Sequence, residues 1–193
     1  MATVKPGAKN HQTPQHAQPF DSVLRLGDVA PLAHAALGDV IHLGIRLTSD
    51  GDALDEIAWL VGKPRQPANA TVCARRDPLL ETIRQQLATW FNNPTFVFKL
   101  PLATPRTEFQ ARLRTALCAT QPGKTLTYGD LAIQLNSAPR AVGQALGSNP
   151  LPIIVPCHRI ISAGKNRLTG FSHTREGPLL AMKAWLLDHE AAR

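Results

Sequence analysis

The feature that most restricts the fold is a change of hydrophobic periodicity along the chain. From Asp39 to Thr48 apolar and polar residues alternate strictly, which is the two-residue period of a half-buried strand. The polar turn Ser49–Asp52 separates this segment from a second apolar one, Leu54–Val61, so the two are predicted to pair as a hairpin. After Arg106 the apolar residues recur at helical spacing instead. We therefore expect a sheet-containing N-terminal part and a helical C-terminal part.

A helix and a further strand are predicted to follow the hairpin. Over residues 78–91 the apolar positions have helical spacing, with a proline in the favourable first turn, and Asn92–Pro94 is expected to end the helix. The segment Thr95–Leu100 predicts another strand. Two histidines, His34 and His42, are interpreted as surface residues. This part of the sequence shows no cluster of catalytic side chains.

Beyond a predicted linker, Pro101–Arg106, the pattern is helical. The predicted helices cover residues 107–119, 128–136, 137–147 and 178–191. The second and third are joined by a tight turn and predict a helix-turn-helix, with Ser137 as N-cap and Pro139 in the first turn. Small residues are frequent in the later helix of this pair, at Ala141, Gly143, Ala145 and Gly147. Such a helix brings its backbone close to a partner, which is either a packed helix or a DNA groove.

Composition divides the chain into three segments. The first, residues 1–20, is rich in Pro, Gln, His and Lys and is predicted to be a disordered tail. Residues 21–100 are predicted to form an α+β domain, and residues 101–193 a helical domain. The predicted fold class is therefore α/β, of the α+β type.

Charge and cysteine content limit the function. A net charge of +7 and a pI near 9.8 favour a polyanionic partner, nucleic acid first. The three cysteines lie far apart without a C-x-x-C pair, which predicts a reducing, cytoplasmic compartment, no disulfide framework and no zinc site. Cys73 and Cys118 are interpreted as packing residues. No apolar run approaches the roughly 18 residues of a membrane-spanning helix, and no secretory signal is expected.

Three adjacent residues, Cys157, His158 and Arg159, follow an apolar segment that prolines interrupt. A thiol beside a base and a permanent cation can be held as the nucleophilic thiolate. A lone cysteine in an apolar segment is more often inert packing. Taken alone, these three residues leave both interpretations open.

An ordered set of residues surrounds this triplet. It comprises "TYGDLA" from Thr127, "RAVGQAL" from Arg140, "GSNP" from Gly147, "PCHR" from Pro156, and a terminal Glu190. The set resembles the O6-alkylguanine-DNA alkyltransferases (methylated-DNA–protein-cysteine methyltransferases), and the likeness extends from about Leu79 to Glu190. The resemblance implies an N-terminal α+β domain of ribonuclease-H-like architecture. It also implies a C-terminal helical domain that binds DNA and carries the catalytic residues.

The resemblance also implies a role for individual residues. Cys157 would accept the alkyl group from O6 of guanine, once per molecule, because the thioether product is not hydrolysed. His158 would take the thiol proton through a bound water, and Glu190 would orient the imidazole. Tyr128 would sit beside the target phosphate and donate to the flipped base, and Asn149 would pin the turn before the cysteine strand.

The implied partner is double-stranded DNA bearing O6-alkylguanine, bound in the minor groove with weak sequence preference. Arg140 would fill the space left by the flipped nucleotide. The other expected DNA contacts are Tyr128, Ala141, Gly143 and Ser148. The expected base pocket consists of Val155, Pro156, Arg159, Ile160, Phe171 and Ser172. No cofactor, metal, membrane or obligate protein partner is expected, and the protein is expected in the cytoplasm, associated with the nucleoid through DNA if bacterial.

The sequence departs from the family pattern after the PCHR motif. Phe171 stands where tyrosine is common, and the extra residues 173–178 precede Lys183. The loop that closes the alkyl pocket is therefore expected to be longer and to lack one hydroxyl, with the backbone donor near Ser172 retained. These changes are expected to affect the range of substrates and the rate of transfer more than the core reaction.

Three alternatives come from other functional classes. A non-catalytic lesion sensor of the alkyltransferase-like kind would lack the cysteine, and Cys157 is present. A helix-turn-helix regulator would need side chains that can read bases, and the small second helix has few. A cysteine hydrolase would be distinguished by sustained turnover of an ester.

Overall fold

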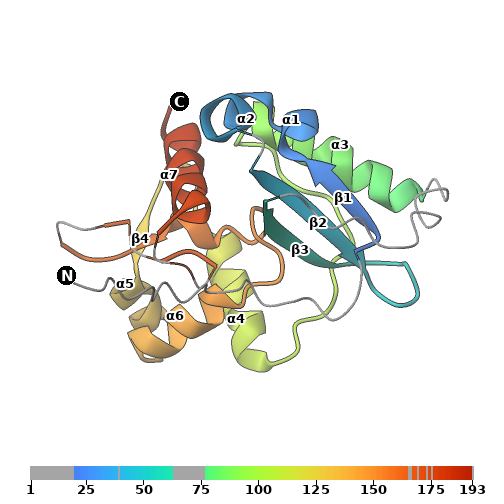
Figure 1. Cartoon of the computed structure of the whole chain (residues 1–193). Helices are drawn as coiled ribbons and strands as arrows, with labels where there is room; N and C mark the ends of the chain where they lie inside the picture. The colour runs from blue at the N-terminus through green and yellow to red at the C-terminus, as the bar shows by residue number, and fades with distance from the viewer. Residues whose placement is uncertain are drawn as a thin grey trace, which may run out of the picture.

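The computed structural model describes residues 20–38, 40–62, 77–164, 167–168, 170–172, 174 and 176–192. The predicted disordered tail, except its last residue, and the packing role of Cys73 lie outside this part of the chain. Within it, the predicted mixed α/β fold is confirmed (Figure 1).

The predicted hairpin forms two strands, β2 (Ile41–Leu47) and β3 (Leu54–Val61), of a three-stranded antiparallel sheet. The spatial order of the strands is β1 (Ser22–Arg25), β2 and β3. The register of the hairpin places Leu43 opposite Trp59. Sequence reasoning missed β1, whose four residues are too few to show a clear period.

The expectation that one face of β2 is exposed was wrong, and so was the surface assignment of His42. Nearly every residue of β2 is buried, and His42 is only 7% exposed. Part of the second face is covered by Phe20, because a Cβ atom on Gly44 would lie 2.8 Å from the Phe20 ring. His34, by contrast, is partly exposed.

Three helices pack around this sheet in Figure 1: α1 (Leu26–Val29), α2 (Pro31–Leu37) and α3 (Pro78–Asn92). The first two were not predicted. Helix α3 is confirmed: Asp77 caps it by accepting a hydrogen bond from the Leu79 amide, and Pro78 occupies the first turn. Its buried residues, Ile83, Leu87, Trp90 and Phe91, have the predicted helical spacing.

The predicted strand Thr95–Leu100 does not form. The Gln86 side chain of α3 accepts a hydrogen bond from the Lys99 amide (2.8 Å) and donates one to the Lys99 carbonyl (3.0 Å). These bonds satisfy the backbone that a neighbouring strand would otherwise pair. The chain meets the sheet only afterwards, at an isolated parallel bridge between Leu54 and Leu102.

The four predicted C-terminal helices are confirmed. They are α4 (Glu108–Cys118), α5 (Tyr128–Gln134), α6 (Pro139–Gly147) and α7 (Pro178–Ala191). Thr127 begins α5 with a capping box to Asp130. The N-cap of α6 is Ala138 rather than Ser137, and no side chain caps it; Pro139 at the first position has no N–H to satisfy.

The predicted cysteine strand is a turn. Cys157–Arg159 form a short 3-10 helix, and only the next two residues, β5 (Ile160–Ile161), pair in parallel with β4 (Leu126–Thr127). Pro150, Pro152 and Pro156 remove backbone donors before the turn, so the segment cannot continue a ladder.

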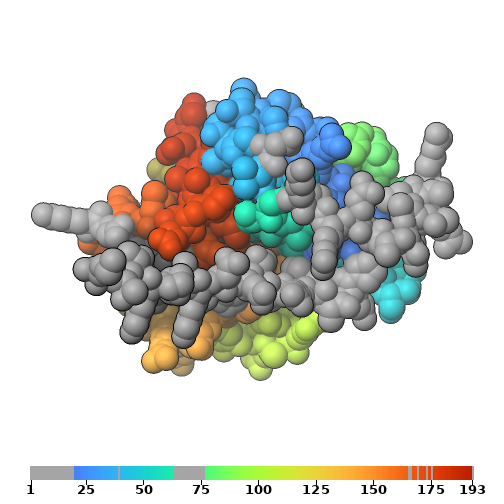
Figure 2. Space-filling view, viewed as in Figure 1, coloured from blue at the N-terminus to red at the C-terminus, as the bar shows by residue number. Residues whose placement is uncertain are grey.

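One hydrophobic core runs through both parts of the chain. Helix α7 contacts α2 and β3, and Figure 2 shows the red C-terminal surface directly against the blue N-terminal surface. No helix in the described ranges is long and apolar enough to cross a membrane.

Candidate active site

Cys157 comes shortly after a turn that Asn149 holds in place. The Asn149 amide donates to the carbonyl of Val155 (2.9 Å), and its oxygen accepts from the Leu151 amide (3.1 Å). Cys157 itself is 7% exposed. Asn149 was expected to pin this turn, and both of its hydrogen bonds lie within it.

The neighbouring side chains converge on one buried carboxylate. His158 Nε2 lies 2.8 Å from Glu190 Oε1, and Arg159 donates to Glu190 through Nε (2.9 Å) and Nη2 (2.8 Å). The Gly123 amide donates to Glu190 Oε2 (3.1 Å). Gly123 has φ +73°, and a Cβ there would lie 3.0 Å from the Glu190 carbonyl, so this position requires glycine. Two segments that are distant from Glu190 in sequence thus hold its buried carboxylate in place.

The protonation states follow from these contacts. Burial acts to raise the pKa of Glu190, but the hydrogen bonds from His158 and Arg159 outweigh it and hold that pKa at about 2. Burial lowers the pKa of His158, against the opposing effect of Glu190. A carboxylate only accepts hydrogen bonds, so the neutral imidazole carries its proton on Nε2. Nδ1 is then a free base; it is buried and has no hydrogen-bond partner among the described residues.

The thiol is held mainly in its neutral form. Burial raises the pKa of Cys157, while the Asn149 amide and the charge of Lys183 act in the opposite direction. Burial lowers the pKa of Lys183 to about 8, and the Cys157 thiolate opposes this shift. In this buried site the thiol is therefore expected to ionise only when a neighbouring base such as His158 takes its proton.

Cys157 opens into a cavity of about 240 Å³, which we call the Cys157 hollow. Its lining residues are Tyr128, Gly143, Leu146, Gly147, Cys157, Gly170, Phe171, Ser172, Thr174 and Lys183. The hollow brings together five residues from the expected site, contributed by α5, α6, the cysteine turn and the segment before α7: Tyr128, Gly143, Cys157, Phe171 and Ser172.

Other expected residues lie elsewhere. The guanidinium of Arg159 was expected at the base pocket, but it lies behind the cysteine turn, bound to Glu190 and to the carbonyl of Thr120 (2.5 Å). Pro156 and Arg159 line a separate cavity of about 270 Å³ instead. Ile160 is fully buried, and its carbonyl accepts from Lys183 Nζ (2.7 Å).

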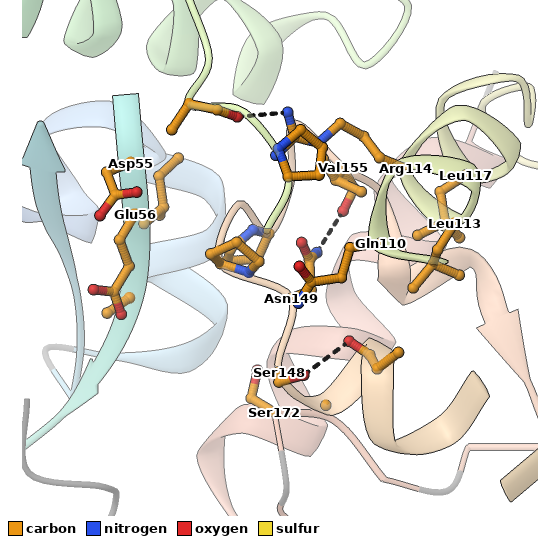
Figure 3. A pocket seen from close by; sticks show the side chains of 18 of the residues that line it. Asp55, Glu56, Gln110, Leu113, Arg114, Leu117, Ser148, Asn149, Val155 and Ser172 are labelled. Atoms are coloured by element: carbon orange, nitrogen blue, oxygen red, sulfur yellow. Dashed lines mark hydrogen bonds between the residues drawn. The ribbon is translucent and has the colours of Figure 1, made fainter. Parts of the chain in front are cut away.

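A larger cavity of about 480 Å³, the α4–β3 hollow, adjoins the Cys157 hollow and shares Gly147 and Ser172 with it. Besides Ser172, three expected site residues line it: Ser148, Asn149 and Val155. Figure 3 shows Asp55 and Glu56 of β3 across this hollow from Leu113, Arg114 and Leu117 of α4. Arg140 and Ala141 lie outside both hollows, exposed at the start of α6.

Comparison with known proteins shows what this chain is similar to. A family model described as the DNA-binding domain of 6-O-methylguanine DNA methyltransferase matches residues 108–192. The methylated-DNA–protein-cysteine methyltransferase of Methanocaldococcus jannaschii is 46% identical over 83 residues, which are 43% of this chain and 46% of that protein. The Haemophilus influenzae protein of the same name is 37% identical over 150 residues, covering 75% of this chain and 78% of that protein.

The chain belongs to the methylated-DNA–protein-cysteine methyltransferase family. Among solved structures, that of Mycobacterium tuberculosis OGT in complex with DNA matches with a TM-score of 0.58 and 29% identity. The match covers 78% of this chain and 87% of that one.

Lys183 is the site residue of this family member that sequence reasoning missed. It is 1% exposed and lines the Cys157 hollow, and its Nζ donates to the carbonyls of Ile160 and Gly170 (3.2 Å). A signal was available: Lys183 has helical spacing with Leu179, Leu186 and Glu190, on the buried face of α7, where the other side chains are apolar except Glu190. A charge on that face indicates a buried, functional contact.

No group of three or more His, Cys, Asp or Glu side chains suited to a metal ion occurs within the ranges that the structure describes.

Proposed function

We propose that Cys157 accepts the alkyl group directly from O6 of a guanine in DNA. The class of enzyme, a methylated-DNA–protein-cysteine methyltransferase of DNA repair, follows from family membership. The observation that supports Cys157 as acceptor is its position in a hollow, directly before a buried His158–Glu190 pair. Its product is a thioether, so each molecule acts once.

In the proposed reaction, His158 Nδ1 takes the thiol proton through a water molecule. The sulfur then forms a bond to the alkyl carbon as the carbon–O6 bond breaks, and the electron pair of that bond stays on guanine. Glu190 stabilises the imidazolium, as the acid does in a hydrolytic triad. Lys183 stabilises the thiolate, since its ammonium acts on Cys157 in that direction.

Tyr128 would stabilise the departing guanine. It lines the Cys157 hollow, and burial raises its pKa, with a further contribution from Cys157. The phenol thus stays protonated and can donate a hydrogen bond to the charge that develops on the base.

We further propose that α6 binds the minor groove and that Arg140 enters the base stack when the nucleotide is flipped out. Arg140 is exposed at the start of α6, and the exposed Ala141 and Ser148 lie on the same helix or at its end. Gly143 joins this surface to the hollow, because it lines the hollow and approaches the Tyr128 ring. The base would thus have a short path from α6 to Cys157.

The division into residues 21–100 and 101–193 is likewise a proposal, as are the monomeric state and the cytoplasmic location. The sheet β1–β3 lies entirely in the first unit, and the Cys157 hollow is lined entirely by the second.

The deciding experiment measures the intact mass of the protein after incubation with a DNA duplex that bears one O6-methylguanine. We expect one methyl group per protein, located on Cys157 and absent in Cys157→Ala. Cys118→Ala is the matched control, because Cys118 is the other cysteine among the described residues and is exposed. Methylation that persists in Cys157→Ala, or tight binding without any mass gain, would overturn the proposal.

The DNA contact has its own test. Arg140→Ala should weaken binding to all duplexes and reduce the slope of log K against log salt by about 1. Arg84→Ala on α3 is the control, since Arg84 is engaged by Glu81 on the N-terminal part. Equal effects of the two variants would exclude a specific role for Arg140.

A further inference from the structure

One wall of the Cys157 hollow is a tight turn of which residues 170–172 and Thr174 are described. The Phe171 amide donates to the Thr174 carbonyl (2.8 Å), and the Thr174 amide donates back to the Phe171 carbonyl (2.9 Å). Gly170 and Ser172 have φ values of +68° and +47°, in the left-handed region. These bonds fix the shape of the turn. They do not fix its distance from Cys157.

Two contacts tie the turn to the rest of the molecule. Lys183 Nζ donates to the Gly170 carbonyl. The Phe171 ring packs against Trp59 of β3, with ring centroids 6.1 Å apart and planes at 52°. Both rings are buried, and in Figure 2 the teal surface of β3 borders the red-orange C-terminal surface. A residue of the N-terminal sheet therefore supports the wall of a hollow that the C-terminal part lines.

The indole of Trp59 contributes to this contact through its ring alone. Its Nε1 is buried and has no hydrogen-bond partner among the described residues. Leaving such a donor unpaired is unfavourable. A tryptophan at this position is thus explained by the area it packs, part of which lies against Phe171.

The turn also separates two cavities. Ser172 lines both the Cys157 hollow and the larger α4–β3 hollow, and Trp59 lines the latter. Truncating Trp59 would enlarge the α4–β3 hollow beside Phe171. The turn could then move toward that space and widen the Cys157 hollow.

We propose that Trp59 is a positioning residue that sets the width of the alkyl pocket by holding the Phe171 turn against Cys157. This inference rests on the proposed function. It assigns to the N-terminal sheet a part in deciding which alkyl groups the cysteine accepts.

The test compares single-turnover transfer from duplexes bearing O6-methylguanine or O6-benzylguanine. In Trp59→Leu the methyl rate is expected to fall about tenfold, because a small displacement of the pocket wall disturbs the alignment for attack. The benzyl rate should fall less, so the benzyl-to-methyl ratio rises. Trp59→Phe retains a ring and should keep the wild-type ratio.

Two further variants separate positioning from general destabilisation. Ile45→Ala removes a buried side chain two positions along the same ladder, where Ile45 lies opposite Ile57, and should leave the ratio unchanged. Phe171→Leu removes the other ring and should raise the ratio as Trp59→Leu does. The double variant Trp59→Leu/Phe171→Leu should show no further rise, because both changes break one contact.

Hydrogen exchange gives a readout that does not depend on catalysis. The amides of Phe171 and Thr174, which pair within the turn, should exchange faster in Trp59→Leu than in Ile45→Ala. An unchanged ratio together with unchanged exchange in Trp59→Leu would overturn the inference. A wild-type protein that never methylates Cys157 would refute the proposed function instead, and the exchange data would still decide whether Trp59 holds the turn.

Discussion

The two walls of the Cys157 hollow are held by different means. The reactive wall, Cys157–Arg159, is bound to Glu190 by charged hydrogen bonds from His158 and Arg159, all buried. The second wall is the turn that contains residues 170–172 and Thr174. Among these residues, Phe171 and Thr174 are hydrogen-bonded to each other, and the turn contacts Lys183 and Trp59. A fully satisfied buried network tolerates little change, whereas an apolar contact adapts. This difference indicates that the chemistry is set by the first wall and the range of alkyl groups by the second.

The largest expected effect comes from Glu190→Gln, which breaks the reactive wall. The substitution keeps the shape but leaves Arg159 as an unpaired buried charge, so we expect a loss of about 3 kcal/mol in the free energy of unfolding. Transfer should slow by about a hundredfold or more, because the imidazolium loses its counter-charge. Chemical denaturation and single-turnover kinetics measure the two effects.

Glu81→Gln is the matched control, since Glu81 pairs with Arg84 on an exposed surface of α3. Such pairs contribute little to stability, so this variant should behave like the wild type. If the two glutamine variants are equally stable, the reactive wall is not held by its charges and the comparison of the walls fails.

The same carboxylate predicts a pH dependence of stability. The pKa of Glu190 is about 2 in the folded protein against an ordinary value of 4.5. The unfolded chain therefore binds the extra proton between these values, and the contribution of Glu190 to stability is complete above pH 4.5 and is lost as the pH falls toward 2. Unfolding curves across this range should show a steeper loss for the wild type than for Glu190→Gln. Parallel curves would contradict the assigned ionisation.

Lys183→Met should have a smaller effect, and one that involves both walls, because Lys183 donates to Ile160, the residue directly after the reactive wall, and to Gly170 on the other wall. Without its charge the pKa of Cys157 should rise, and we expect transfer to slow about tenfold. The pH profile of thiol alkylation by iodoacetamide measures the shift directly. Lys124→Met, at an exposed lysine outside the hollow, is the control.

Lys183 also makes stability rise with pH in the alkaline range. Its pKa is about 8 when folded against 10.5 ordinarily, so between these values the unfolded chain holds more protons and unfolding becomes less favourable as the pH rises. Lys183→Met should lack this rise. If the free energy of unfolding of the variant depends on alkaline pH as that of the wild type does, the pKa of Lys183 is not lowered in the folded protein.

The sequence predicted the reactive wall better than the turn. Cys157, His158 and Glu190 belong to a resemblance that rests on residue types at ordered positions, and the structure brings them together. Helices such as α3 and α7 were predicted because apolar periodicity, joined in α3 by a proline in the first turn, is a local signal. The contact between Trp59 and Phe171 joins residues more than a hundred positions apart, and no local pattern encodes it.

Two errors have the same origin. The segment Thr95–Leu100 has the pattern of a strand, but the side chain of Gln86 satisfies its backbone, a tertiary contact that periodicity cannot show. His42 alternates as a surface residue should, yet the second face of its strand is covered. In both cases the local preference is sound and a distant part of the chain overrides it.

The smallest expected effect is that of Phe171→Tyr, which restores the residue common in the resembling family and tests the adaptable wall. The ring that packs against Trp59 is retained, so the benzyl-to-methyl ratio should stay within about twofold of the wild-type value. The added hydroxyl enters a buried contact, and an unpaired hydroxyl there should lower the free energy of unfolding by about 1 kcal/mol. Phe98→Tyr controls for the hydroxyl itself, because Phe98 is half-buried and stacks on the ring of Trp90.

A methyl-transfer rate that rises by about tenfold in Phe171→Tyr alone would mean that the hydroxyl stabilises the reacting groups, since an added hydrogen bond can supply that much. The turn would then belong to the chemistry as well as to the fit, and the separation of the two walls would no longer hold.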